Sequence, residues 1–157
     1  MKLTATENIE APIGFVYAAL ADFENWERSA LRRGAEVERL DRLRQPGAGM
    51  EWKVGFDYRA KKRHVEIKLL TLTPGQTLVF DCMGQPAEAI LKVELAEMGP
   101  RRTRVVVEVE VKPRTLAARL FLQSLRLAKA KVNRRFALRL AQTAADIEDR
   151  YKAQAKT

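Results

Sequence analysis

The amino-acid sequence predicts an α+β protein in which a curved antiparallel sheet of about six to seven strands wraps around one long C-terminal helix. Two observations predict the sheet. Apolar and polar residues alternate in a series of short segments, and turn signals rich in Gly and Pro separate these segments. A third observation predicts helices, because apolar residues recur at helical spacing near both ends of the chain. Short turns between consecutive strands favour an antiparallel meander with one covered face and one wet face.

The chain begins with an alternating segment, Lys2–Ile9, which we expect to be a strand. Pro12 then stands in the first turn of a predicted helix, in which apolar residues continue at helical spacing to Leu20. A second helical segment starts at Asp22 and ends at Gly34. We therefore predict two short helices directly after the first strand.

Six further segments are expected to be strands: Val37–Leu43, Met50–Arg59, Arg63–Leu72, Leu78–Cys82, Ala87–Leu95 and Thr103–Val111. A sheet with one apolar concave face needs a cover. The one element of sufficient size is a helix predicted from Thr115 to about Ala155, so the sheet should grip it.

Length and composition indicate a single domain over residues 1–157. Hydrophobic residues make up 46% of the chain and charged residues 31%, which is ordinary for a globular protein. The single cysteine, Cys82, excludes an internal disulfide and fits a reducing compartment. The first residues do not have the pattern of a signal peptide, and there is no run of about 18 apolar residues. We expect a cytoplasmic protein.

The net charge of +9 is concentrated in the terminal helix, since residues 114–157 hold 11 of the 29 basic residues and 3 of the 20 acidic ones. No acidic residue occurs between Val111 and Ala145. From Val132 onward the helix is amphipathic with a basic outer face. Apolar residues from Leu116 to Leu127 instead surround most of the helix, so either the helix bends around Lys129–Lys131 or this segment buries apolar surface on two sides.

Burial on two sides leaves three interpretations of Leu116–Leu127 open: a cavity mouth, a contact in a homodimer, or contact with an anionic membrane surface. The basic helix could also contact nucleic-acid phosphates. Nucleic-acid binding is not favoured, because Phe121 and Phe136 are the only aromatic residues among these cations and both are expected in packing.

The stretch from Ile9 to Trp26 resembles the opening of the START-like (SRPBCC) superfamily, which includes polyketide cyclases/dehydratases and birch-pollen-allergen-like proteins. The first strand ends in an Ala11-Pro12 step, the helix carries a Val16-Tyr17 pair, and Asp22 and Trp26 occupy the places that start the second helix. The resemblance implies a helix-grip fold over Lys2 to about Tyr151. It also implies an elongated cavity between the sheet and the helix for an apolar or amphipathic molecule.

Strand phase and the apolar content of the terminal helix place mostly apolar side chains in that cavity, with Tyr58 as the best polar candidate for orienting a ligand. The residues predicted to bind a ligand are Trp52, Phe56, Tyr58, Phe80, Leu91, Val107, Phe121, Leu125 and Phe136. Such walls fit a binding cavity better than an acid–base site, which needs a positioned proton carrier. No catalytic residue, metal site or cofactor is predicted: His64 has the phase of the outer face, Cys82 is expected to be a small buried side chain, and one histidine with one cysteine is too few for a zinc site.

We therefore expect a protein that binds a hydrophobic or amphipathic small molecule, such as a lipid, a quinone or an aromatic polyketide-like compound, for transport, sensing or storage. A first alternative is an enzyme of the polyketide cyclase/dehydratase type, in which Tyr58 or a helix arginine would polarise a carbonyl. A second is a membrane-contacting lipid or quinone carrier, or a chaperone, that uses Leu116–Leu125 and the adjacent cations.

Overall fold

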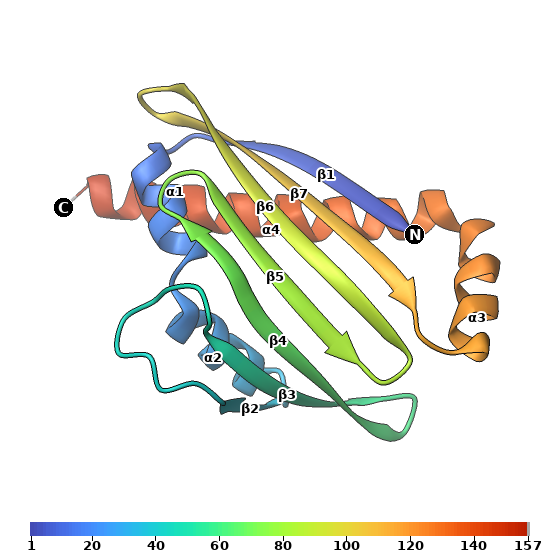
Figure 1. Cartoon of the computed structure of the whole chain (residues 1–157). Helices are drawn as coiled ribbons and strands as arrows, with labels where there is room; N and C mark the ends of the chain where they lie inside the picture. The colour runs from blue at the N-terminus through green and yellow to red at the C-terminus, as the bar shows by residue number, and fades with distance from the viewer. Residues whose placement is uncertain (157) are drawn as a thin grey trace.

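The computed structural model describes residues 1–156 and contains one seven-stranded antiparallel sheet with four helices among these residues (Figure 1). The elements follow one another as β1 (Lys2–Ile9), α1 (Ile13–Leu20), α2 (Phe23–Arg32), β2 (Glu36–Arg39), β3 (Glu51–Tyr58), β4 (Lys61–Thr73), β5 (Thr77–Gly84), β6 (Ala87–Gly99), β7 (Arg102–Pro113), α3 (Leu116–Arg126) and α4 (Lys129–Ala155). The predicted α+β class and the helix-grip arrangement are confirmed.

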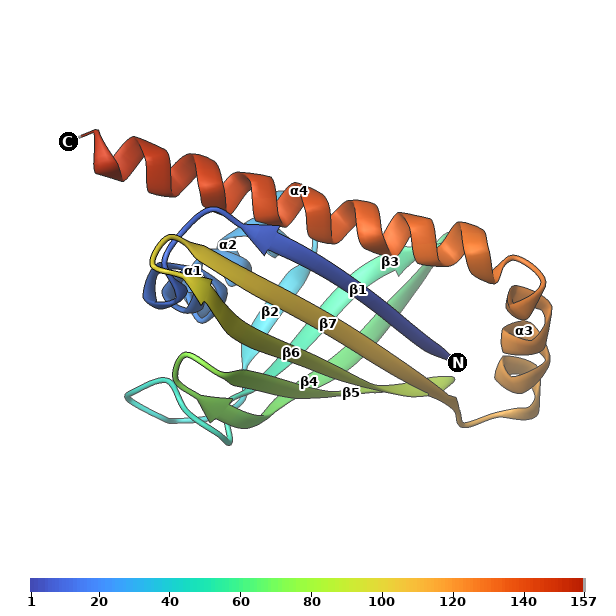
Figure 2. The same cartoon turned by 90° about the horizontal axis from the view of Figure 1, so that it is seen from above.

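The sheet is an antiparallel meander whose two edge strands are β1 and β2. Its order is β1-β7-β6-β5-β4-β3-β2, so β1 pairs with the last strand and β2 lies at the opposite edge. The sheet curves, and α4 lies along its concave side, where it packs on β1 and α1 (Figure 2). Helices α1 and α2 lie at one end of the sheet, and α3 lies at the other (Figures 1 and 2).

The ends of the short helices have the residues that the sequence indicated. The Asp22 side chain caps α2 by accepting a hydrogen bond from the backbone N–H of Asn25, at 3.3 Å. After α2, Gly34 has φ of +89°, a left-handed conformation that glycine adopts without a steric penalty. Between the first strand and α1, the buried hydroxyl of Thr103 donates a 2.8 Å hydrogen bond to the carbonyl of Ala11 and so joins β7 to the start of α1.

Two predicted elements differ from the structure. The strand expected over Val37–Leu43 is the four-residue β2, because after Arg39 the chain turns away to form a loop around the Asp41 carboxylate. The single helix expected from Thr115 to Ala155 is two helices, which a turn at residues 127–128 separates. This break comes just before Lys129–Lys131, close to the bend that the sequence predicts as one alternative to burial of Leu116–Leu127 on two sides.

The core lies under the α1–α2 end of the sheet. Its most completely buried side chains come from the sheet and from α1 and α4: Ile9, Val16, Leu69, Leu78, Val105 and Ile147. In α4 the buried residues are Ala144 and Ile147, both in the C-terminal half. The first half of α4 contains no buried residue, and its side chains border a cavity. Within residues 1–156, no helix has both the length and the apolar composition needed to cross a membrane.

Candidate functional site

A cavity of about 510 Å³, which we call the main cavity because it lies between the sheet and its covering helices, is bounded by the concave face of the sheet, α2 and the first half of α4. Strands β2 to β7 supply its floor, mostly with aliphatic and aromatic side chains. The lining residues are Leu20, Phe23, Trp26, Glu27, Ala30, Val37, Trp52, Val54, Ile67, Leu78, Phe80, Cys82, Leu91, Val93, Val107, Phe136, Arg139, Leu140 and Thr143. A cavity of this size and wall chemistry is typical of sites for small apolar ligands.

Strand phase explains why the floor is apolar. In β3, Trp52 and Val54 point to the concave face, and their partners across the ladder in β4 are Ile67 and Val65. The same relation continues from Phe80 in β5 to Leu91 in β6. The register shift in β4 falls after Leu69, so it does not reverse the phase of the residues in the cavity.

The predicted ligand-binding residues divide into three groups in the structure. Trp52, Phe80, Leu91, Val107 and Phe136 line the main cavity. Phe56 lies instead in a second cavity, and Tyr58, Phe121 and Leu125 line neither. For Tyr58 the reason is that the β3–β4 hairpin extends beyond the helices that cover the sheet, so the ring is exposed between Arg59 and Arg63. Whether the five residues bind a ligand stays a prediction.

Phe121 and Leu125 lie outside the main cavity because the helix breaks. The break at residues 127–128 places α3 at the end of the sheet, where the Phe121 ring lies 5.8 Å from the guanidinium carbon of Arg59 at the hairpin tip. Arg59 and Ala60 both have positive φ, 52° and 61°, which gives the hairpin turn the backbone of a two-residue type I′ connection.

The second cavity, of about 520 Å³, lies at this same end of the sheet. It is more polar than the first, and its walls include Phe56, Arg63 and the β5–β6 turn from Gly84 to Ala87. The Nε atom of Arg63 is buried and has no hydrogen-bond partner within the described chain. Cys82 lines both cavities, so the two are neighbours along β5.

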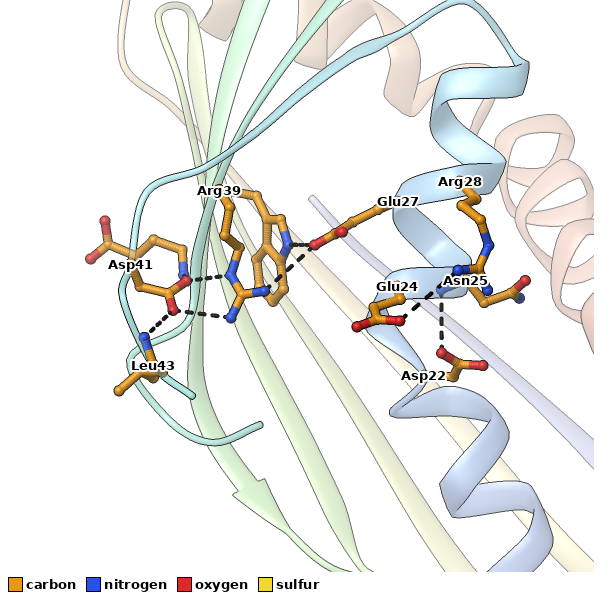
Figure 3. A network of polar contacts seen from close by, with 10 residues as sticks. Asp22, Glu24, Asn25, Glu27, Arg28, Arg39, Asp41 and Leu43 are labelled. Carbon is orange, nitrogen blue, oxygen red and sulfur yellow. Dashed lines mark hydrogen bonds and ion pairs between the residues drawn. The ribbon is translucent and has the colours of Figure 1, made fainter. Parts of the chain in front are cut away.

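A polar network fixes the α2 wall of the main cavity to the sheet (Figure 3). The indole N–H of Trp52 donates a 2.7 Å hydrogen bond to Glu27 Oε1, and the guanidinium of Arg39 lies 3.7 Å from the same oxygen. Arg39 also lies over the Trp52 ring, 5.5 Å from its centroid. Glu27 is thus held by a cation and an indole at the edge of an apolar cavity, which orients α2 against β2 and β3.

The Asp41 carboxylate completes this network on the side of the loop. It accepts hydrogen bonds from two guanidinium nitrogens of Arg39 and from the backbone N–H groups of Leu43 and Glu51, at 2.9 and 2.8 Å. The hydrogen bond from Arg39 is the main cause that holds the pKa of Asp41 well below its ordinary value. Asp41 in turn raises the pKa of Arg39, so the pair stays ionised at neutral pH.

Asp41→Asn is expected to lower the free energy of unfolding at neutral pH by about 1–3 kcal/mol, because it weakens a bidentate ion pair whose carboxylate is largely buried. A depressed pKa stabilises the folded state above the unfolded pKa of about 4 and loses this effect as the pH falls through the folded value. The difference between the two proteins should therefore shrink below about pH 4. Urea unfolding at several pH values measures this difference, and the control is Asp149→Asn, at an exposed position of α4. A difference independent of pH would contradict this account.

The side chains with reactive groups, His64, Cys82 and Tyr58, do not come together in the main cavity. His64 is exposed on the convex face, where it lies beside Gly55 and Glu36. Burial, and secondarily the neighbouring Asp81, raise the pKa of the Cys82 thiol to about 11, so it is uncharged at neutral pH. Tyr58 is at the hairpin tip. The cavity wall is therefore supplied by packing residues, with Glu27, Arg139 and Thr143 as its polar members.

Glu27, Arg139 and Thr143 are not among the residues predicted from the sequence to bind a ligand, although the spacing of the α2 residues indicated one of them. Phe23, Trp26, Glu27 and Ala30 recur at helical spacing, which places Glu27 on the apolar side of α2. On α4, Arg139 and Thr143 follow Phe136 on the same face, and the Thr143 hydroxyl donates a 3.1 Å hydrogen bond to the carbonyl of Arg139. The guanidinium of Arg139 makes no hydrogen bond or ion pair within residues 1–156.

The sequence profile of the family described as polyketide cyclase/dehydrase and lipid transport matches residues 1–148. The chain belongs to this family. Among curated proteins, none matches the chain.

Solved structures of the family's fold are similar to the chain over almost its whole length. The ZhuI aromatase/cyclase of a Streptomyces species has a TM-score of 0.67 at 15% identity, with 96% of this chain and 94% of that one covered. A Thermus thermophilus protein has a TM-score of 0.62 at 19% identity, with 98% and 99% covered. A START superfamily protein of Mycobacterium smegmatis has a TM-score of 0.57 at 12% identity, with 85% and 95% covered. At these identities the similarities establish the fold and not the activity.

Proposed function

We propose that this member of the polyketide cyclase/dehydrase and lipid transport family binds a hydrophobic or amphipathic small molecule in the main cavity. The observation that carries the proposal is a 510 Å³ cavity whose floor is entirely aliphatic and aromatic apart from Cys82. Walls of this kind offer an apolar molecule close packing on several sides, which is what a site for a hydrophobic ligand requires.

The ligand lies with its apolar part on the sheet and its polar end at the rim between α2 and α4. Arg139 and Thr143 stand there on α4, whereas Glu27 on α2 is already engaged by Trp52 and Arg39. The unpaired guanidinium of Arg139 favours a polar end that accepts hydrogen bonds or carries negative charge. Glu27 is a member of the wall rather than a free base, so we propose binding and no reaction.

Native mass spectrometry of the purified protein tests the proposal directly. A bound species that is released on denaturation, and a rise in the midpoint of thermal unfolding when a fatty acid or quinone is added, are the expected results. No bound species, and no change of the midpoint with any of a panel of fatty acids, quinones and polycyclic phenols, would contradict it.

Arg139→Gln is expected to weaken the binding of a long-chain carboxylate about tenfold, the equivalent of ~1.4 kcal/mol, because one charge-assisted hydrogen bond is lost. Binding of the alcohol with the same chain should change much less. The control is Arg135→Gln, which removes the same charge from an exposed position one turn away on α4 that does not line the cavity. Equal losses for the acid and the alcohol would place the polar end elsewhere.

A further inference from the structure

The outer face of α3 and of the turn that follows it is a stripe of three exposed leucines. Leu116, Leu120 and Leu127 are 71%, 57% and 95% exposed. At 100° per residue they fall within a 40° arc of the helix surface, so they form one continuous stripe. The opposite face, with Ala118, Leu122 and Leu125, is partly buried against the rest of the protein. Apolar residues thus occupy both sides of α3, and the described chain covers one side.

The position of α3 explains why nothing in the described chain covers the stripe. Figure 2 shows α3 at the end of the molecule, beyond the strands and beside the start of α4. Its base is joined to the β5–β6 turn, because the N–H of Arg114 donates a 2.9 Å hydrogen bond to the carbonyl of Pro86. Thr115 caps the helix itself by accepting a hydrogen bond from the N–H of Ala118. The leucines are therefore presented by an anchored helix, and a stable apolar stripe on an outer surface marks an interaction site.

The charges around the stripe decide which partner it fits. Arg119, Arg126, Lys129 and Lys131 are exposed and make no ion pair within residues 1–156. No acidic residue occurs between Val111 and Ala145 to offset them. A second copy of the chain would bring an equally cationic helix against this one, so electrostatic repulsion opposes a dimer through α3. An anionic partner with an apolar interior matches both the cations and the leucines.

We propose that α3 docks the protein on an anionic phospholipid membrane. Leu116, Leu120 and Leu127 enter the boundary between head groups and acyl chains, and Arg119, Arg126 and Lys129 contact the lipid phosphates. The stripe, the flanking cations and the exposed turn together have the composition of a helix that lies in the plane of a membrane interface. The proposal stands independently of what the main cavity binds.

Docking through α3 also places the second cavity next to the membrane. The β3–β4 hairpin tip contacts α3 through Arg59 and Phe121, and the β5–β6 turn that lines this cavity is joined to the segment before α3. The second cavity therefore lies at the docked end, and Cys82 lines both this cavity and the main cavity.

Flotation of the full-length protein with vesicles tests the proposal. Vesicles of phosphatidylcholine alone are compared with vesicles that also contain about one third phosphatidylglycerol, at low and at high salt. We expect flotation with the anionic vesicles at low salt, little flotation with phosphatidylcholine, and a marked decrease as salt is added. Absence of flotation, or equal flotation with both kinds of vesicle, overturns the proposal.

Matched variants separate insertion of the leucines from adsorption by charge. Leu116→Gln/Leu120→Gln/Leu127→Gln should reduce the fraction bound to anionic vesicles about tenfold. The control is Leu31→Gln/Leu70→Gln/Met98→Gln, which changes three exposed apolar residues on α2, β4 and β6. Circular dichroism and thermal unfolding show whether each variant remains folded. If both triple variants float like the unchanged protein, charge alone holds it and the proposal is wrong.

The charged residues have a control of their own. Arg119→Gln/Arg126→Gln should weaken flotation several-fold, whereas Arg42→Gln/Arg44→Gln removes the same charge from the β2–β3 loop and should have little effect. Equal effects of the two double variants would show a response to net charge and would overturn docking through α3. Light scattering in solution covers the remaining alternative: a dimer that the leucine variant converts to a monomer would assign the stripe to a second copy of the chain and overturn the proposal.

Discussion

Leu91→Trp should weaken ligand binding in the main cavity by at least about 30-fold, the equivalent of ~2 kcal/mol. Leu91 lies on β6 in the middle of the cavity floor, with Phe80 opposite it on β5 and Val109 opposite it on β7. An indole at this position projects into the space that the ligand needs. Displacement of a fluorescent naphthylamine, excited outside the indole absorption band, measures the loss.

The same substitution should leave the protein folded, because Leu91 lines the cavity and is only partly buried, so the larger ring can project into the cavity. We expect the free energy of unfolding to change by less than about 1.5 kcal/mol. The control is Lys92→Trp, the adjacent residue of β6, whose side chain is exposed on the convex face. The cavity is not the binding site if the two variants bind the probe with equal affinity.

The apolar floor of the cavity could be predicted from the sequence because a strand has a period of two, which is a local property. Alternation alone predicts four of the lining residues on the concave face: Trp52, Phe80, Leu91 and Val107. The register shift in β4 comes only after Leu69 and does not reverse their phase. Alternation also predicts that Tyr58 points inward, but its side chain is exposed, so the prediction of burial is wrong. The alternation of residues in a strand predicts the face of the sheet on which a side chain lies. Whether a helix covers that part of the face depends on tertiary structure.

The helix residues show the same distinction. Phe136 lies in the part of the helix that packs over the sheet, and it lines the main cavity. Phe121 and Leu125 were assigned to the ligand on the assumption of one continuous helix. The turn at residues 127–128 directs α3 to the end of the sheet, away from the main cavity. The change of apolar phase near Lys129 indicated this break, but it could not show in which direction the first segment turns.

The Glu27–Arg39–Asp41 network could not be predicted, since its members come from a helix, a short edge strand and a loop. Their sequence separations carry no periodicity, and each alone has the appearance of a surface charge. The network forms because the loop after β2 folds back to place the Asp41 carboxylate beside the N–H groups of Leu43 and Glu51. That loop also ends β2 after four residues, which is why the predicted strand is too long.

The second large effect is expected at the anchor of α4. Ile147→Ala should lower the free energy of unfolding by about 2–5 kcal/mol, and Ile147→Val by about 0.5–1.5 kcal/mol, because both remove buried methyl or methylene groups. Ile147 is 2% exposed and belongs to the core cluster, and the one other buried residue of α4 is Ala144, one turn away. Urea unfolding followed by circular dichroism measures the three proteins.

Leu138→Ala is the control on the same helix, because Leu138 is exposed on its outer face and should change the free energy of unfolding by less than about 0.5 kcal/mol. The contrast matters for function, because Phe136, Arg139 and Leu140 form the cavity wall in the half of α4 that contains no buried residue. We expect a helix anchored at its C-terminal end to let that wall adjust to ligands of different size. If Ile147→Ala and Leu138→Ala changed the free energy of unfolding equally, α4 would not be anchored at Ile147. The expectation that the cavity wall adjusts to its ligand would then be wrong.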